Sequence, residues 1–139
     1  MFLLDTNVVS DLRRARTGRG DPKVARWAEA QEPSSLFLSV MTLFEVEVGI
    51  RRLGRRDPVQ AAALRSWMTG HLETAFTGRI LNIDDRISIL AASFHAPDPA
   101  PFADSFIAAT ALVHGMVVVT RNRADFAYPG LRLLDPWEG

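Results

Sequence analysis

Short apolar runs alternate with segments of helical spacing along the chain. The runs are hydrophobic on both faces, so a strand formed from any of them has no polar side to turn toward water. Strands of that kind lie in parallel sheets with helices on both sides, because each face needs an apolar cover. The runs are residues 2–4, 35–40, 80–83, 116–120 and 131–134. We therefore predict an α/β protein with a mostly parallel central sheet.

Helix signals fill the segments between these runs. Asp57 followed by Pro58 is typical of a helix start, and apolar residues at helical intervals over 59–76 predict a helical hairpin with the preceding helix, which ends near residue 53. Asp84 is placed to cap a helix that runs through residue 94. Gly115 is placed to end an alanine-rich helix that opens at residues 103–105.

Length and composition favour one folded domain over residues 1–139. Hydrophobic residues make up 47% of the chain and charged residues 23%, which is the balance of a globular protein. No apolar run approaches the ~20 residues that cross a bilayer, and the opening residues reach Asp5 before any signal-peptide core can form. We expect no membrane association and a cytoplasmic location. The chain has no cysteine, so a metal would be held by oxygen or histidine.

The charge pattern bears on nucleic acid binding. The formal net charge is zero, which argues against a general nucleic-acid binder. Arginine, whose planar fork suits phosphate, is nevertheless clustered. The clusters are Arg13, Arg14, Arg16 and Arg19; Arg51, Arg52, Arg55 and Arg56; and Arg121 with Arg123. Solvated helix faces explain each cluster equally well.

Acidic residues stand where the predicted strands pass into helices or loops. Asp5, Glu45, Asp104 and Asp125 occupy strand-to-helix turns, first helical turns or the loop after a strand. Ligands of open α/β sheets bind beyond the carboxyl ends of the strands, so these acids are expected to converge. Four converging carboxylates repel one another unless a cation neutralises them, and oxygen ligands favour Mg²⁺, with Mn²⁺ as the alternative. The predicted reaction is metal-assisted hydrolysis of a nucleic-acid backbone.

Each acid also has a purely structural explanation. Asp5 could cap the first helix, although the two residues after it can do so as well. Thr42 and Glu45 have the spacing of a capping box, which explains Glu45 as well as metal ligation does. Asp104 suits a helix N-terminus whatever its role, and Asp125 could belong to a turn.

Other polar and aromatic residues are assigned to structure rather than to chemistry. Glu47 is expected to point into solvent. The three histidines are widely separated and lack metal-site spacing, so they are interpreted as surface or capping residues. The tryptophans are interpreted as core or interface residues before base-stacking platforms. These residues are His71, His95 and His114, and Trp27, Trp67 and Trp137.

Four segments together resemble the PIN-domain toxins of VapC type. They are Leu3-Leu4-Asp5-Thr6-Asn7-Val8, Thr42-x-x-Glu45-x-x-x-Gly49, Ala103-Asp104-x-x-Ile107-Ala108-Ala109-Thr110-Ala111, and Val119-Thr120-Arg121-Asn122-x-x-Asp125-Phe126. The resemblance extends through Leu133-Leu134-Asp135-Pro136-Trp137, and the order and spacing of four motifs are far more specific than any one of them.

The resemblance implies a three-layer α/β/α sandwich and Mg²⁺-dependent cleavage of RNA by a toxin that a small cognate antitoxin inhibits. It also implies a homodimer, with DNA contacted only through the antitoxin. By position, Asp5 and Asp104 would hold the metal directly, while Glu45 and Asp125 would bind it through water or orient the attacking water. The supporting polar residues would be Thr6 and Asn122. Because some PIN domains carry an acid where this chain has Asn122, the number of metal ions stays open.

Alternatives to this interpretation differ in chemistry. A phosphatase of the haloacid dehalogenase type needs a second aspartate where the chain has Asn7, and a receiver domain needs a late lysine, which is absent. The stronger alternative is a binding module of the same fold, which cuts nothing and acts with a DNA-binding antitoxin in transcriptional autoregulation. The class of RNA target is not fixed by the sequence, and single-stranded or looped RNA is the physical default.

Overall fold

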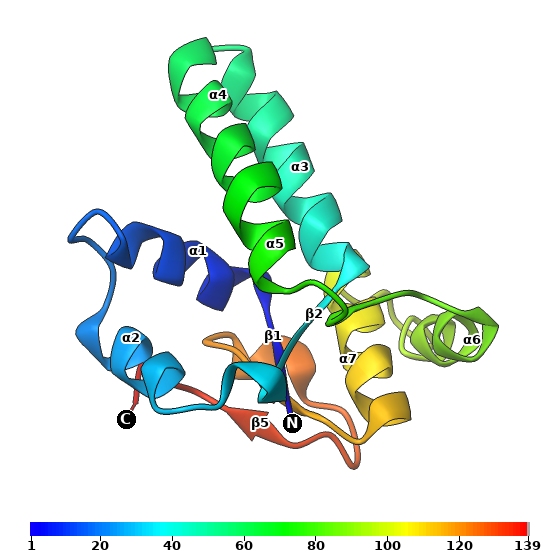
Figure 1. The fold of residues 1–139 in the computed structure, drawn as a ribbon. Helices are drawn as coiled ribbons and strands as arrows, with labels where there is room; N and C mark the ends of the chain where they lie inside the picture. The colour runs from blue at the N-terminus through cyan, green and yellow to red at the C-terminus, as the bar shows by residue number, and fades with distance from the viewer. Residues whose placement is uncertain (139) are drawn as a thin grey trace.

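The computed structural model describes residues 1–138 and contains a five-stranded sheet between two helical layers (Figure 1). The strands are β1 (Phe2–Leu4), β2 (Leu36–Ser39), β3 (Ile80–Leu81), β4 (Val117–Val119) and β5 (Leu133–Leu134). Their order is β3-β2-β1-β4-β5, and every pairing is parallel. The predicted α/β/α sandwich is confirmed, and β1 lies at the centre of its sheet.

Ten helical segments connect the strands. They are α1 (Thr6–Ala15), α2 (Pro22–Glu29), η1 (Pro33–Ser35), α3 (Val40–Gly54), α4 (Pro58–Trp67), the π-helical turn η2 (Met68–Leu72), α5 (Glu73–Ala75), α6 (Asp85–Ser93), α7 (Phe102–His114) and η3 (Arg123–Phe126). Asp57 and Asp84 cap α4 and α6 as predicted, and Gly115 ends α7 in the left-handed region at φ 67°. None of the helices within residues 1–138 is both long and apolar enough to cross a membrane.

Alternate side chains of the central strand enter two separate cores. Leu4 packs with Val8 and Val9 of α1 in the core that α2 and α4 also cover. Leu3 packs on the opposite face with Ile107 of α7, together with Phe126. Both leucines are fully buried. This alternation explains why the short strand shows no polar face in the sequence.

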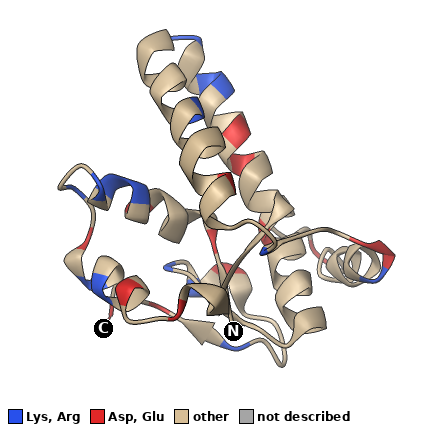
Figure 2. Cartoon of the chain, viewed as in Figure 1, with Lys and Arg blue, Asp and Glu red and all other residues tan. Residues whose placement is uncertain are grey.

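Helices α3 and α4 form the predicted hairpin, which projects from the sheet in Figure 1. Arg65 of α4 donates bidentate hydrogen bonds of 2.8 and 2.6 Å to Glu47 of α3, and Arg51 contacts the same carboxylate at 3.2 Å. Glu47 is partly exposed, in line with the expectation that it is solvated, but the antiparallel helix also supplies it with an ion-pair partner that the sequence pattern did not predict. Figure 2 shows basic residues gathered at the distal end of this hairpin.

The start of α3 corrects a second expectation. Ser39, the last residue of β2, is the N-cap, and its hydroxyl accepts a 3.0 Å hydrogen bond from the Met41 N–H. Thr42 lies inside the helix and is fully buried. The capping-box explanation of Thr42 and Glu45 was wrong, so the Glu45 carboxylate does not cap the N-terminus of α3.

Candidate functional site

Three of the four predicted acids meet at one end of the sheet. Asp5 directly follows β1, Glu45 lies in the second turn of α3 after β2, and Asp104 lies in the first turn of α7. One carboxylate oxygen from each of these residues lies within 4.8 Å of the others. The convergence follows from the sheet order, because β1 and β2 are parallel neighbours whose carboxyl ends share an edge.

Asp5 is the most buried member of the cluster, with 4% of its surface exposed. Its Oδ1 accepts a 2.8 Å hydrogen bond from the Thr6 N–H, which makes it the N-cap of α1. Its Oδ2 accepts a 2.8 Å hydrogen bond from the Thr120 hydroxyl. Burial raises the pKa of Asp5, these two hydrogen bonds oppose the rise, and the charges of Glu45 and Asp125 add to it. The capping role and a ligand role are thus compatible.

Asp104 has the most strongly perturbed carboxyl group of the cluster. Burial raises its pKa to about 7, and the nearby charges of Asp5, Glu45 and Asp125 contribute to the rise. A cation bound among these carboxylates would favour their charged forms. The helix N-terminus that carries Asp104 does not outweigh the surrounding negative charge.

Glu45 is oriented from the other side of the cluster by Thr6. The Thr6 hydroxyl lies 2.6 Å from Glu45 Oε1 and donates to it, and the Thr42 hydroxyl lies 3.3 Å from the Thr6 hydroxyl. Thr6 therefore contacts one of the predicted acids, and its supporting role in catalysis stays a prediction. Thr42, a buried residue that the sequence pattern assigned to capping, belongs to the same chain of hydroxyls.

Asp125 lies beside the cluster rather than within it. It is an exposed residue of η3 and is not among the three acids whose oxygens meet. Its charge still raises the pKa of both Asp5 and Asp104, which places it within electrostatic range. Asn122 takes part through its backbone, whose N–H donates to Thr120 and whose carbonyl accepts from the Asp125 N–H. Among residues 1–138, the Asn122 side chain has no hydrogen-bond partner.

Thr120 is a site residue to which the sequence pattern gave no role. It is fully buried, and its hydroxyl donates to Asp5 while accepting from the Asn122 N–H at 3.0 Å and from Asn7 Nδ2 at 3.5 Å. The available signal was its place directly after β4, at the same sheet edge as the acids. Tyr128 also borders the site, since burial and the charges of Asp104 and Asp125 raise its pKa.

The donor set fits a small divalent cation. With Mg–O bonds of about 2.0–2.1 Å, two ligand oxygens on one Mg²⁺ lie no more than about 4.2 Å apart. The oxygens of Asp5, Glu45 and Asp104 already lie within 4.8 Å, so small side-chain rotations suffice. The cluster could therefore hold an ion, and its carboxylates match the preference of hard cations for oxygen.

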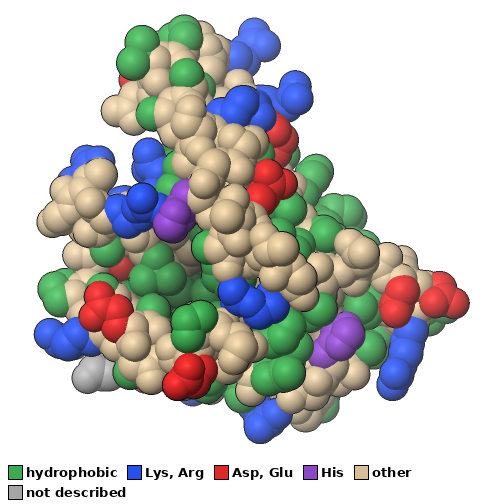
Figure 3. Space-filling model, in the orientation of Figure 1, with side chains coloured by type: hydrophobic (Ala, Val, Ile, Leu, Met, Phe, Trp, Pro, Cys, Tyr) green, Lys and Arg blue, Asp and Glu red, His purple; other side chains and the backbone are tan. Residues whose placement is uncertain are grey.

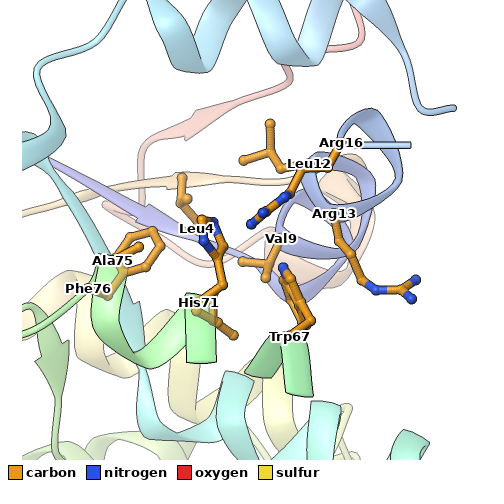
Figure 4. A pocket seen from close by; sticks show the side chains of 10 residues that line it. Leu4, Val9, Leu12, Arg13, Arg16, Trp67, His71, Ala75 and Phe76 are labelled. Atoms are coloured by element: carbon orange, nitrogen blue, oxygen red, sulfur yellow. The ribbon is translucent and has the colours of Figure 1, made fainter. Parts of the chain in front are cut away.

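Two hollows flank the acidic edge. One is lined by Glu45 with the exposed rings of Phe44 and Phe102 and the guanidinium of Arg52, between α3 and α7. The other, of about 110 Å³, lies between α1 and the hairpin, where Val9 and Leu12 face Trp67 and Phe76 (Figure 4). Arg13, Arg16 and His71 also line this hollow, as Figure 4 shows. Figure 3 shows Lys or Arg and His side chains beside hydrophobic ones on this face of the molecule.

Comparisons with known proteins agree with this geometry. The plasmid stability protein StbB of Pseudomonas syringae pv. tomato is 36% identical, and the VapC ribonuclease Y4jK of Sinorhizobium fredii is 33% identical, each over 99% of both chains. A solved structure of FitAB bound to a DNA fragment matches with a TM-score of 0.80 at 30% identity and covers 99% of this chain and 96% of that chain. The profile of the PIN domain matches residues 2–129. The chain therefore belongs to the PIN domain family.

Proposed function

We propose that this chain is a Mg²⁺-dependent endoribonuclease, with Mn²⁺ as the alternative ion, and that it acts as the toxin of a toxin–antitoxin pair. The observation that carries the proposal is the convergence of carboxylate oxygens from Asp5, Glu45 and Asp104 within 4.8 Å. The relatives named as a VapC ribonuclease and a plasmid stability protein support an RNA substrate and a toxin role. We further propose that residues 1–139 act as one domain, in the cytoplasm, where RNA is accessible.

The four acids are assigned different roles, according to the hydrogen bonds that each of them makes. Asp5 and Asp104 hold the ion directly, since Asp5 is fixed through both oxygens and Asp104 is free of side-chain partners among residues 1–138. Glu45 and Asp125 bind through water or orient the attacking water. The Thr6 hydroxyl occupies Glu45 Oε1 and leaves Oε2 available to hydrogen-bond a water molecule. A divalent ion bound here would stabilise the developing charge on the phosphodiester and make water more acidic.

Substrate phosphates are held by arginine. Arg52 is exposed and lines the hollow that contains Glu45, whereas Arg121 lies over the Trp137 ring at 5.2 Å and Arg123 pairs with Glu138. Arg52 is therefore free to position a phosphate next to the acids. A single-stranded or looped RNA is the substrate that can enter this open edge.

The partners are a small antitoxin protein and a second copy of the chain. The apolar hollow between α1 and the hairpin, rimmed by Arg13 and Arg16, suits a hydrophobic segment with acidic flanks from the antitoxin. The zero net charge is consistent with DNA contact only through that partner, and the DNA-bound FitAB structure supports this arrangement. The exposed rings of Phe44 and Phe102, at 51% and 61% exposure, support a homodimer.

Cleavage of a labelled structured RNA by the purified protein tests the proposal. We expect cleavage with Mg²⁺ or Mn²⁺, and none with EDTA or in the Asp5→Asn and Asp104→Asn variants. Glu29→Gln, which changes an exposed acid on α2, is the matched control and retains full activity. Equal cleavage by Asp5→Asn and the unchanged protein would contradict the proposed site.

The alternative function is a binding module that cuts nothing and acts with a DNA-binding antitoxin in transcriptional autoregulation. The zero net charge favours it, because the partner would then provide the basic surface. A folded protein that binds Mn²⁺ and its antitoxin but cuts no RNA in any condition would support this alternative.

A further inference from the structure

His95 makes two hydrogen bonds that fix the state of its ring. Its Nδ1 accepts from the Ala100 N–H at 3.2 Å, and its Nε2 lies 2.9 Å from the Ser105 hydroxyl. That hydroxyl donates to the Phe102 carbonyl at 2.6 Å, so it accepts from His95. The partners therefore assign the proton to Nε2. His95 thus connects the end of the loop before α7 to a fully buried serine in the first turn of that helix.

The loop that His95 contacts has little other support. Residues 96–101, all of which the structure describes, include three prolines, which have no N–H. Of the three N–H groups that remain, only that of Ala100 has a partner, and the partner is His95. Helix α7 begins after Pro101, and no side chain caps it. His95 and Ser105 therefore provide the side-chain hydrogen bonds at this helix start.

The same first turn carries Asp104, where the need for support is greatest. Its carboxylate faces those of Asp5 and Glu45, with oxygens within 4.8 Å. Like charges at this distance repel, and an uncapped first turn is the part of a helix that opens most easily. Ser105 is the next residue and points into the core, so its hydrogen bonds resist displacement of the turn from within.

His95 is itself held on a rigid part of the fold. The backbone N–H of His95 donates a 3.1 Å hydrogen bond to the Ala92 carbonyl at the end of α6. The preceding residue, Phe94, stacks on Tyr128 with ring centroids 3.9 Å apart and planes 19° apart. Helix α6 also packs against α7 along a shared core. The His95 imidazole therefore joins the start of α7 to a well-packed part of the fold.

We propose that His95 is a positioning residue for the metal site: through Ala100 and Ser105 it holds the first turn of α7 so that Asp104 stays directed at Asp5 and Glu45. The proposal rests on the proposed function in that it takes Asp104 to be a metal ligand. His95 touches neither metal nor substrate and acts only through the turn. Removal of a group hydrogen-bonded directly to a metal ligand lowers metal affinity by about 10–100-fold in known sites, so the lower end of that range is expected for His95, which acts through the turn.

Mn²⁺ binding to the full chain, measured by calorimetry, tests the proposal together with amide hydrogen exchange. His95→Ala is expected to weaken Mn²⁺ binding about tenfold and to speed exchange at Ala100 and Ser105, whose N–H groups donate to His95 Nδ1 and to the Pro101 carbonyl, with β1 and β4 unchanged. His95→Gln keeps a donor for Ser105, and His95→Asn keeps an acceptor for Ala100, so both are expected to recover part of the affinity. His114→Ala, at the exposed opposite end of α7, is the matched control.

The outcomes separate this proposal from the proposed function. Unchanged Mn²⁺ affinity in His95→Ala, or faster exchange spread over β1 and β4, would overturn the positioning role. In a double-mutant cycle, His95→Ala should cost less affinity in a Ser105→Ala background than in the unchanged protein, because the two side chains share one hydrogen bond. An equal cost in both backgrounds would contradict the role of that contact. If the unchanged protein binds no Mn²⁺, the proposed function fails. Exchange at Ala100 and Ser105 then still decides whether His95 holds the turn.

Discussion

The Thr6 hydroxyl donates a 2.6 Å hydrogen bond to Glu45 Oε1 and so joins the start of α1 to α3 across 39 positions of sequence. Thr6→Val removes the donor while keeping the shape of the side chain. A hydrogen bond to a charged group contributes about 1.5–3 kcal/mol, so we expect kcat/KM for RNA cleavage to fall about tenfold or more. Thr6→Ser keeps the hydroxyl and should remain near the unchanged rate. Equal kcat/KM values for Thr6→Val and Thr6→Ser would show that the hydrogen bond to Glu45 is dispensable.

Thr120 controls the proton affinity of Asp5. Its hydroxyl donates to Asp5 Oδ2, and this hydrogen bond lowers a pKa that burial raises. Thr120→Val should therefore raise the pKa of Asp5 further and move the acid side of the Mg²⁺-binding profile to higher pH. Carbon-detected NMR titration of the Asp5 carboxyl group in EDTA measures the shift, with Thr120→Ser as the control. A titration curve that does not move would contradict this role.

The apo protein should lose stability as the pH rises toward neutrality. Folding raises the pKa of Asp104 from 3.8 to about 7, so between these values the folded state binds more protons than the unfolded state. The free energy of unfolding therefore decreases as the pH rises through this window. The stabilising contribution of protonated Asp104 is fully present below pH 3.8 and is lost as the pH passes about 7. Urea midpoints in EDTA should be higher at about pH 5 than at about pH 8, and Asp104→Asn should reduce the difference. Equal slopes in both proteins would rule out Asp104 as the cause.

Arg52 is expected to affect substrate binding more than the chemical step. It lines the hollow beside Glu45 and has no ion-pair partner among residues 1–138. Arg52→Ala should raise KM for RNA several-fold at low salt and leave Mn²⁺ affinity unchanged, because the proposed role of this residue is to bind phosphate and not the metal. Arg52→Lys should recover only part of the loss. A fall in kcat without a change in KM would exclude this role.

Alanine should destabilise the protein at Gly115 and stabilise it at Gly49. Gly115 has a φ of 67°, a left-handed conformation that ends α7, whereas Gly49 lies in the interior of α3 with open space around it. Gly115→Ala is expected to lower the free energy of unfolding by about 1 kcal/mol. Gly49→Ala should instead raise it by a similar amount. Urea unfolding of both variants checks the opposite signs.

Local signals predicted much of the fold because short-range physics determines them. Asp57, Asp84 and Gly115 end or begin helices through contacts with residues three or four positions away, and such contacts can be recognised in a sequence. The cap of α3 was misplaced because Ser39 had been included in a strand run. When β2 ends at Ser39, its hydroxyl becomes the cap and Thr42 turns inward.

Contacts between distant segments could not be read from the sequence. Thr120 meets Asp5 across 115 positions, and Arg65 meets Glu47 across 18, so each depends on the strand order or on the register of the hairpin. The convergence of Asp5, Glu45 and Asp104 was accessible only because the ends of parallel strands share an edge. Their assignment as metal ligands, with Asp125 beside them, stays a prediction until metal binding is measured.

The central place of β1 also determines when the sheet can be completed during synthesis. Phe2 pairs with Leu36 on one side and with Val117 on the other, so β1 gains its second neighbour only after residues 117–119 have been made. Asp5 receives the Thr120 hydrogen bond at that same late stage, after Asp104 has been made. The central sheet and the hydrogen bonds that orient Asp5 are therefore completed together, only when most of the chain has been made.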